Sequence, residues 1–212
     1  MPHHLIFPSL HSSIFQSTPN SSIFGQISLD LTITAMNKFL GFVLFLGVSI
    51  FLPAHAQIEL EEKSFLNDRI ELSVPTAFDV MSEEIMKLKY PSERRPQVVY
   101  SNESGGINVG LSLTDNNASQ EELFQFVETF ERTFTSVYPS AEWSGYGIKY
   151  VDKRKVGYLE FITPAIDTEI YNLMFFTDLD GKLLICTFNC TRKSVEEWTE
   201  TAHEILSSLK IL

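Results

Sequence analysis

Four apolar-rich segments follow one another in the second half of the chain, and only short polar turns separate them. They span residues 143–151, 155–164, 169–177 and 182–189. Connections this short join antiparallel strands, because a parallel crossover needs a dozen or more residues. The sequence therefore predicts an antiparallel meander, and any fold for this chain must be built around it.

Helical patterns stand on either side of the meander. Residues 119–138 carry apolar side chains at spacings of three and four, and Ser119 with Glu122 fits a capping box. Residues 194–209 show a similar apolar stripe that includes Trp198. Upstream we expect strands at 67–74, 97–101 and 107–114 and a short helix capped by Ser82. This order predicts an α+β domain in which a central antiparallel β-sheet is flanked by helices.

The N-terminal part of the chain contains an export signal. Lys38, the apolar run 39–52 and the small residues before Gln57 reproduce the three regions of a secretory signal peptide. A membrane span needs about 20 apolar residues, and this run is shorter. We expect residues 36–56 to be cleaved as a signal peptide, which leaves an exported, soluble protein in the periplasm or outside the cell.

The remaining boundaries follow from that signal. Residues 1–35 are interpreted as an over-long gene prediction with translation starting at Met36, and a disordered leader is the alternative. We expect a flexible N-terminal segment at 57–66 and a single domain at 67–212. Cleavage would leave about 156 residues, which is enough for one hydrophobic core.

The chain is acidic, with a net charge of −11. Removal of residues 1–56 takes away one lysine and one aspartate, so this charge does not change. Nucleic acids and anionic lipids are bound mainly by lysine and arginine. We therefore expect no nucleic-acid partner. Because the apolar run is removed with the signal peptide, we also expect no stable membrane span after cleavage. A protein partner is the expectation, and the oligomeric state stays open.

Both cysteines, Cys186 and Cys190, fall in one predicted strand. Four residues of strand separate their Cα atoms by about 13 Å, whereas a disulfide tolerates no more than about 7 Å. The sequence favours two buried free thiols; a bend near Asn189 or a bridge between molecules are the alternatives.

No catalytic constellation is evident in the sequence. His203 is the one histidine after residue 56, and its helix neighbours Glu200 and Glu204 indicate a solvated face. A carboxylate-dependent hydrolase remains an alternative, and its candidate acids are Asp167, Glu169, Asp178 and Asp180. We expect no catalytic residues, no metal site and no cofactor, since motifs for phosphate, zinc or nucleophile chemistry are lacking.

Four residues are candidates for contact with a partner. Arg94 and Arg95 form a basic spot between two prolines, although a loop held by local ion pairs is the more ordinary interpretation. Tyr146 and Tyr150 share one face of a predicted strand, and exposed tyrosines are good interface anchors. Strand alternation directs Trp143 to the opposite face.

Three segments of the sequence carry a family resemblance: Ile70–Pro75 followed by Phe78, Lys87–Pro91, and Trp198–Ile211. With them, most of residues 65–212 resembles the superfamily of the photosystem II extrinsic protein PsbP, which includes DcrB-like periplasmic proteins and a eukaryotic Ran-binding factor. The resemblance implies an α/β/α sandwich that serves mostly to bind other proteins and has no shared enzymatic centre. It transfers no functional residues, because no site motif matches.

These observations predict an exported, non-enzymatic binding or accessory protein of the cell envelope. Two alternatives remain: the small secreted hydrolase, and an envelope immunity or stress-response protein that differs in what it binds.

Overall fold

The computed structural model describes residues 57–90 and 95–212. A seven-stranded antiparallel sheet has the order β3-β4-β5-β9-β8-β7-β6, and a second sheet has the order β1-β2-β10. The large sheet contains β3 (Asp79–Val80), β4 (Val98–Ser101), β5 (Asn108–Asn117), β6 (Glu142–Val151), β7 (Arg154–Pro164), β8 (Glu169–Leu179) and β9 (Lys182–Thr191). The small sheet contains β1 (Leu60–Phe65), β2 (Ile70–Pro75) and β10 (Lys210–Ile211), and the helices are α2 (Glu83–Lys89), α3 (Leu123–Val137) and α4 (Val195–Ser207).

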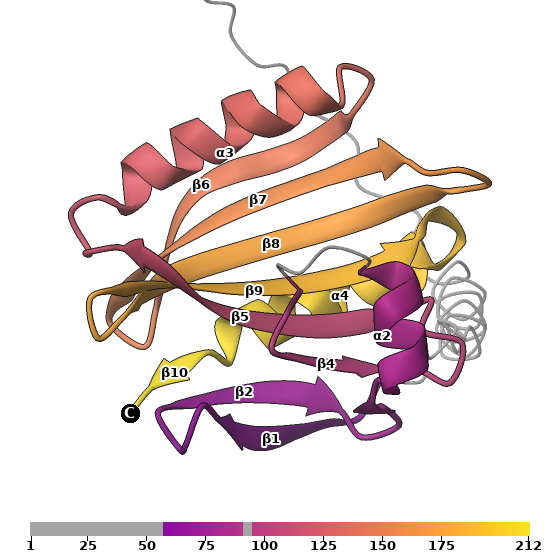
Figure 1. The fold of residues 1–212 in the computed structure, drawn as a ribbon, viewed down its shortest axis with the longest axis horizontal. Helices are drawn as coiled ribbons and strands as arrows, with labels where there is room; N and C mark the ends of the chain where they lie inside the picture. The colour runs from indigo at the N-terminus through magenta and orange to yellow at the C-terminus, as the bar shows by residue number, and fades with distance from the viewer. Residues whose placement is uncertain (1–56, 91–94) are drawn as a thin grey trace, which may run out of the picture. The chain divides into compact units, whose positions relative to one another are not determined.

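The two faces of the large sheet carry separate apolar clusters. On one face, α3 buries Leu123 and Val127 in a cluster with residues of β7, β8 and β9. On the other face, α4 and the small sheet close over a larger cluster that contains Phe175 and Phe188. Figure 1 shows α3 alongside β6 and α4 behind β9. The predicted α+β class, with an antiparallel sheet between helices, is confirmed.

The predicted meander is confirmed as β6-β7-β8-β9, with every neighbouring pair antiparallel. Two of its three turns use left-handed backbone. Asp152 and Lys153 have φ of 44° and 66°, and Asp180 and Gly181 have φ of 51° and 75°. Positive φ at both central residues is the geometry of a tight two-residue hairpin, which fixes the register of the strands beside it. The helix capped by Ser82 is also confirmed, since the Ser82 side chain accepts from the N–H of Ile85.

The prediction of a flexible segment at 57–66 was wrong. Residues 60–65 form β1, which pairs antiparallel with β2 from Leu60 opposite Pro75 to Phe65 opposite Ile70. The polar sequence of β1 hides this, because an edge strand with one exposed side needs little apolar alternation. Residues 66–69 make the turn, so the strand expected from residue 67 begins at Ile70.

The predicted capping box of the long helix was also wrong. α3 begins at Leu123, and the Ser119 hydroxyl donates to the Glu122 carboxylate over 2.7 Å instead of capping a backbone N–H. The side chain of Gln120 accounts for the difference, because it is held by the start of β7 and the end of β8. It accepts from the N–H of Lys155 over 2.7 Å and donates to the Asp178 carboxylate over 2.6 Å. These bonds hold residue 120 against the sheet before the helix starts.

Several predictions fall on residues outside the described ranges. The signal peptide at 36–56, the interpretation of residues 1–35 and the position of Arg94 are among them. They remain predictions. Among the described helices, none combines the length and the apolar character needed to cross a bilayer.

Candidate functional site

Within residues 57–90 and 95–212, the face of the large sheet that α3 packs on is only partly covered. In β9, the side chains of Leu184, Cys186 and Phe188 are fully buried on the α4 side. The alternate residues Ile185, Thr187 and Asn189 point to the α3 side and are only half-buried. Figure 1 shows β8 and β9 passing between α3 and α2 with no described helix in front of them. Polar side chains at alternate positions of an otherwise apolar strand were the sequence signal for this surface, and the sequence reasoning missed it.

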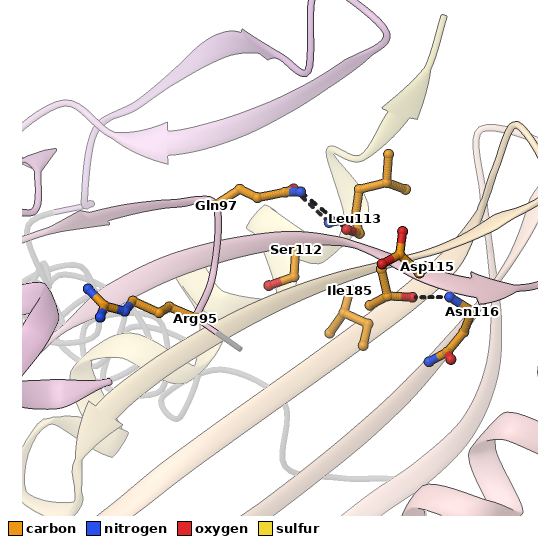
Figure 2. Close-up of a pocket in the computed structure, with 8 residues that line it drawn as sticks. Arg95, Gln97, Ser112, Leu113, Asp115, Asn116 and Ile185 are labelled. Carbon is orange, nitrogen blue, oxygen red and sulfur yellow. Dashed lines mark hydrogen bonds between the residues drawn. The ribbon is translucent and has the colours of Figure 1, made fainter. Parts of the chain in front are cut away.

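A pocket of about 590 Å³ opens on this uncovered face. Its lining residues are Arg95, Gln97, Ser112, Leu113, Thr114, Asp115, Asn116 and Ile185. Ser112 of β5 lies directly opposite Ile185 of β9, so the two strands form the floor. Figure 2 shows Arg95 and Asp115 at opposite ends of the pocket. Among the described lining residues, the floor is therefore neutral, and Arg95 and Asp115 supply one charged group of each sign.

Two polar side chains that line the pocket, Gln97 and Thr114, form hydrogen bonds with the protein backbone. The Gln97 side chain accepts from the N–H of Leu113 over 2.8 Å and donates to its carbonyl over 3.2 Å, as dashed in Figure 2. It thereby extends the pairing between β4 and β5 to the residue that precedes β4. The Thr114 hydroxyl accepts from the N–H of Asn116 over 3.2 Å. Gln97 and Thr114 shape the pocket rather than serve a ligand.

Other polar groups on the same face have no partner within the described residues. The side-chain hydroxyls of Ser112 and Thr187 form no hydrogen bond with any other described residue. Polar groups on a concave surface that lack protein partners are the groups with which a ligand can bond.

A second, smaller hollow of about 120 Å³ continues the surface along β9. Thr187 lines it two residues after Ile185, a separation of about 7 Å along a strand. Two side-chain amides bridge it: the Asn189 amide donates to the side-chain oxygen Oδ1 of Asn172 over 2.8 Å, and the Asn172 amide donates to the Thr163 hydroxyl over 3.1 Å. We call the surface formed by Ser112, Ile185, Thr187, Asn189 and Asn172 the β9 strip.

Of the predicted contact residues, the structure places Arg95 at the β9 strip. Arg95 lies near the first turn of α2, where Lys87 and, more weakly, Arg95 hold the pKa of Glu83 below its ordinary value. Tyr146 and Tyr150 lie elsewhere, on β6 at the far edge of the sheet, and are 51% and 74% exposed. The structure therefore separates the basic candidate from the aromatic ones.

The prediction that Trp143 faces away from Tyr146 was wrong. A β-bulge interrupts the register between Trp143 and Gly145, so Trp143 lies opposite Phe161 and Tyr146 lies opposite Leu159. Phe161 and Leu159 are two residues apart on one face, which puts both aromatics on that face. Their rings meet edge to face, with centroids 5.8 Å apart.

Three of the four carboxylates considered for a hydrolase are engaged in ion pairs, and the fourth, Asp167, is exposed. Asp178 lies 2.7 Å from Arg154, and Asp180 lies 2.9 Å from Arg69. Glu169 lies 3.8 Å from Arg192. These contacts join strands and turns, and they give the hydrolase hypothesis no support.

His203 is less solvated than the sequence indicated, because it faces the half-buried Glu160. Its Nε2 lies 3.3 Å from a carboxylate oxygen of Glu160, and its Nδ1 lies 3.4 Å from the Lys149 ammonium. Glu160 also accepts from the Tyr171 hydroxyl over 2.8 Å. Burial and this acid raise the pKa of Tyr171 far above its ordinary value. Within the described residues no hydroxyl or thiol side chain bonds to the His203 ring, so the cluster lacks a nucleophile.

Metal-ligating side chains do not gather in the described part of the chain. No group of three or more histidine, cysteine, aspartate or glutamate residues there could hold a metal ion.

The two thiols are free and buried in β9, as predicted, and β9 runs without a break to Thr191. Burial raises the pKa of Cys186 far above its ordinary value and that of Cys190 to about 12. Because the thiolate is the reactive form, we expect neither thiol to react with an aromatic disulfide reagent at pH 8 in the native protein. Both should react after unfolding in urea. A reading of fewer than two thiols in urea would indicate a bridge between molecules.

Comparison with known proteins supports the fold. No protein-family model matches this sequence, and no curated protein matches it either. Among solved structures, the chain is similar to the solution structure of cyanobacterial PsbP (CyanoP) from Synechocystis sp. PCC 6803, with 15% identity and a TM-score of 0.50 over 73% of this chain and 94% of that chain.

Two further solved structures match with lower TM-scores. The Ran-binding protein Mog1p of Saccharomyces cerevisiae has 13% identity and a TM-score of 0.43, over 73% of this chain and 96% of that chain. LpqN, involved in cell envelope biogenesis of Mycobacterium tuberculosis, has 13% identity and a TM-score of 0.47, over 73% of this chain and 91% of that chain. At 15% identity, the similarity to cyanobacterial PsbP speaks to the fold alone. An antiparallel sheet between helices, together with the similarity to cyanobacterial PsbP, shows that this chain has a PsbP-like fold.

Proposed function

We propose that this protein is an exported, non-enzymatic accessory protein of the cell envelope, and that it binds a protein partner along the β9 strip. The observation that carries the proposal is a contrast between two sets of polar groups. The candidate catalytic groups Asp178, Asp180 and His203 are paired with other side chains. By contrast, the hydroxyls of Ser112 and Thr187 are not paired with any side chain in the described part of the chain.

The chemistry of the strip indicates what kind of segment it accepts. Hydroxyl and amide groups on its floor can both donate and accept hydrogen bonds, and Ile185 adds an apolar contact. An extended, polar peptide segment fits these groups better than an apolar ligand does.

Export is supported by the signal-peptide pattern at 36–56. N-terminal sequencing and intact mass of the protein from cell fractions test it directly. A soluble extracytoplasmic species that begins at Gln57 is expected. An uncleaved species in the membrane or cytoplasm would overturn the export part of the proposal.

Binding along the strip is tested with two serine substitutions of the same kind. Ser112→Tyr places a ring over the pocket floor, whereas Ser136→Tyr places the same ring on the exposed side of α3. Affinity capture from extracytoplasmic extract, followed by titration of the recovered partner, should show at least a tenfold loss of affinity for Ser112→Tyr and none for Ser136→Tyr. Equal affinity for both variants, or no partner with the wild-type protein, would contradict the proposal.

An immunity or stress-response role would use the same strip and differ in the partner. The identity of the recovered protein decides between these roles, because an immunity protein would recover a toxin.

A further inference from the structure

β6 forms one edge of the large sheet, and its outer side pairs with no strand in the described ranges. Exposed edges invite pairing with other strands, and proteins commonly block them with charge. β1, at the edge of the small sheet, follows that rule with Glu61, Glu62 and Lys63. The segment of β6 from residue 146 to residue 150 does not follow it, because its exposed side chains are the two tyrosines Tyr146 and Tyr150.

The one lysine in β6 does not shield the edge. The Lys149 ammonium lies 4.9 Å from the ring centroid of Tyr158, on the neighbouring inner strand, and 3.4 Å from His203. Its charge is therefore drawn inward over the sheet. Helix α3 packs on the face of the sheet beside β6 (Figure 1), with Phe126 and Phe130 against Phe176 of β8.

The turn after β6 determines which backbone groups face outward. Asp152 and Lys153 form a two-residue turn, so Val151 and Arg154 are the hydrogen-bonded pair that closes the hairpin. Hydrogen-bonded and non-hydrogen-bonded pairs alternate along antiparallel strands. Tyr146, Ile148 and Tyr150 therefore direct their N–H and C=O groups away from β7.

We propose that β6 pairs antiparallel with β6 of a second copy of this chain, about a two-fold axis at Ile148. In that register Ile148 lies opposite Ile148 of the second copy, and Tyr146 lies opposite Tyr150. The three outward N–H groups and three outward C=O groups of each copy then bond to those of the other. The two large sheets become one continuous sheet.

The side chains of β6 are complementary to one another in this register. On the α3 side, each tyrosine meets a tyrosine, and directly opposed aromatic residues stabilise strand pairs. On the other side, Gly147 lies opposite Lys149 of the second copy, which leaves room for the lysine stem. No two like charges are directly opposed, and the bulge before Gly145 lies outside the paired segment. An unrelated strand would satisfy the backbone but not this side-chain pairing.

The interface is short, so the dimer should form at micromolar rather than nanomolar protein concentration. Sedimentation velocity of the purified protein over a hundredfold concentration range measures it. The wild-type protein should shift from monomer to dimer across that range. A protein that stays monomeric at the highest concentration would overturn the proposal.

A charge exchange tests the register. In the double variant Tyr146→Lys with Tyr150→Lys, position 146 of each copy places a lysine opposite the lysine at position 150 of the other copy. The repulsion at these two places should raise the dissociation constant of the dimer at least tenfold. Tyr146→Glu with Tyr150→Lys places opposite charges there and should keep the dimer near wild-type affinity. Both residues are exposed, so circular dichroism should show both variants folded.

Two results would contradict the proposed register. Equal weakening of the dimer by both double variants would mean that residues 146 and 150 are not opposed. A dimer unaffected by either would place the contact elsewhere on the surface. Neither result bears on the β9 strip, because Ser112 and Thr187 do not lie on β6.

Discussion

Replacing Gly157 with alanine is expected to lower the free energy of unfolding by about 3 kcal/mol. Gly157 lies in β7 directly opposite Phe176 of β8, and a methyl group on its Cα would lie 2.4 Å from Cε2 of that ring. The ring cannot retreat, because it is fully buried and meets the rings of Phe126 and Phe130 edge to face. Urea denaturation followed by circular dichroism measures the loss.

The control for this substitution is Gly145→Ala in β6. There the nearest heavy atom to the added methyl is the Tyr158 hydroxyl oxygen at 3.6 Å, an ordinary contact distance. The free energy of unfolding should change by about 0.5 kcal/mol or less. If both glycine variants unfold at the same urea concentration, the close packing of Phe176 on Gly157 is wrong.

Replacing Trp198 with alanine is expected to cost about 4 kcal/mol of stability. The indole of α4 stacks between two rings, with centroids 5.4 Å from Phe78 and 5.8 Å from Phe188. Phe188 belongs to the large sheet, and Phe78 lies in the segment between β2 and β3. Removal of the indole leaves a cavity where the helix and these two regions meet.

Trp198→Phe provides the comparison, because it keeps an aromatic ring between Phe78 and Phe188. We expect a loss of about 1.5 kcal/mol for this variant, measured by the same denaturation. Equal losses for the phenylalanine and alanine variants would show that the stacked arrangement does not contribute.

Periodicity in the sequence predicted the elements whose burial is regular. Ile70, Leu72 and Val74 alternate in β2, and all three are fully buried. The apolar stripe of α4 is likewise buried around Trp198. In such elements the side-chain pattern reflects the face that packs on the core, so the pattern alone suffices.

The elements that escaped prediction depend on contacts between distant residues. A one-residue bulge near Ser144 reverses the face of Trp143, and nothing in the local alternation marks it. The start of α3 depends on Gln120 bonding to Lys155 and Asp178, which are remote in sequence.

One feature of the β9 strip can be predicted from local periodicity, and another depends on contacts between distant residues. The sequence shows Thr187 and Asn189 at alternate positions of an apolar strand, which marks one face as polar. Whether that face is open depends on how far α3 reaches across the sheet, and strand periodicity cannot predict that distance.

The two buried thiols of β9 bear on the conditions under which this chain can fold. Cys186 and Cys190 are both fully buried and unlinked, so the folded state requires no oxidation step. Its stability should be the same in reducing and in oxidising buffer. The chain can therefore fold on either side of a boundary between redox compartments, without help from disulfide-forming enzymes.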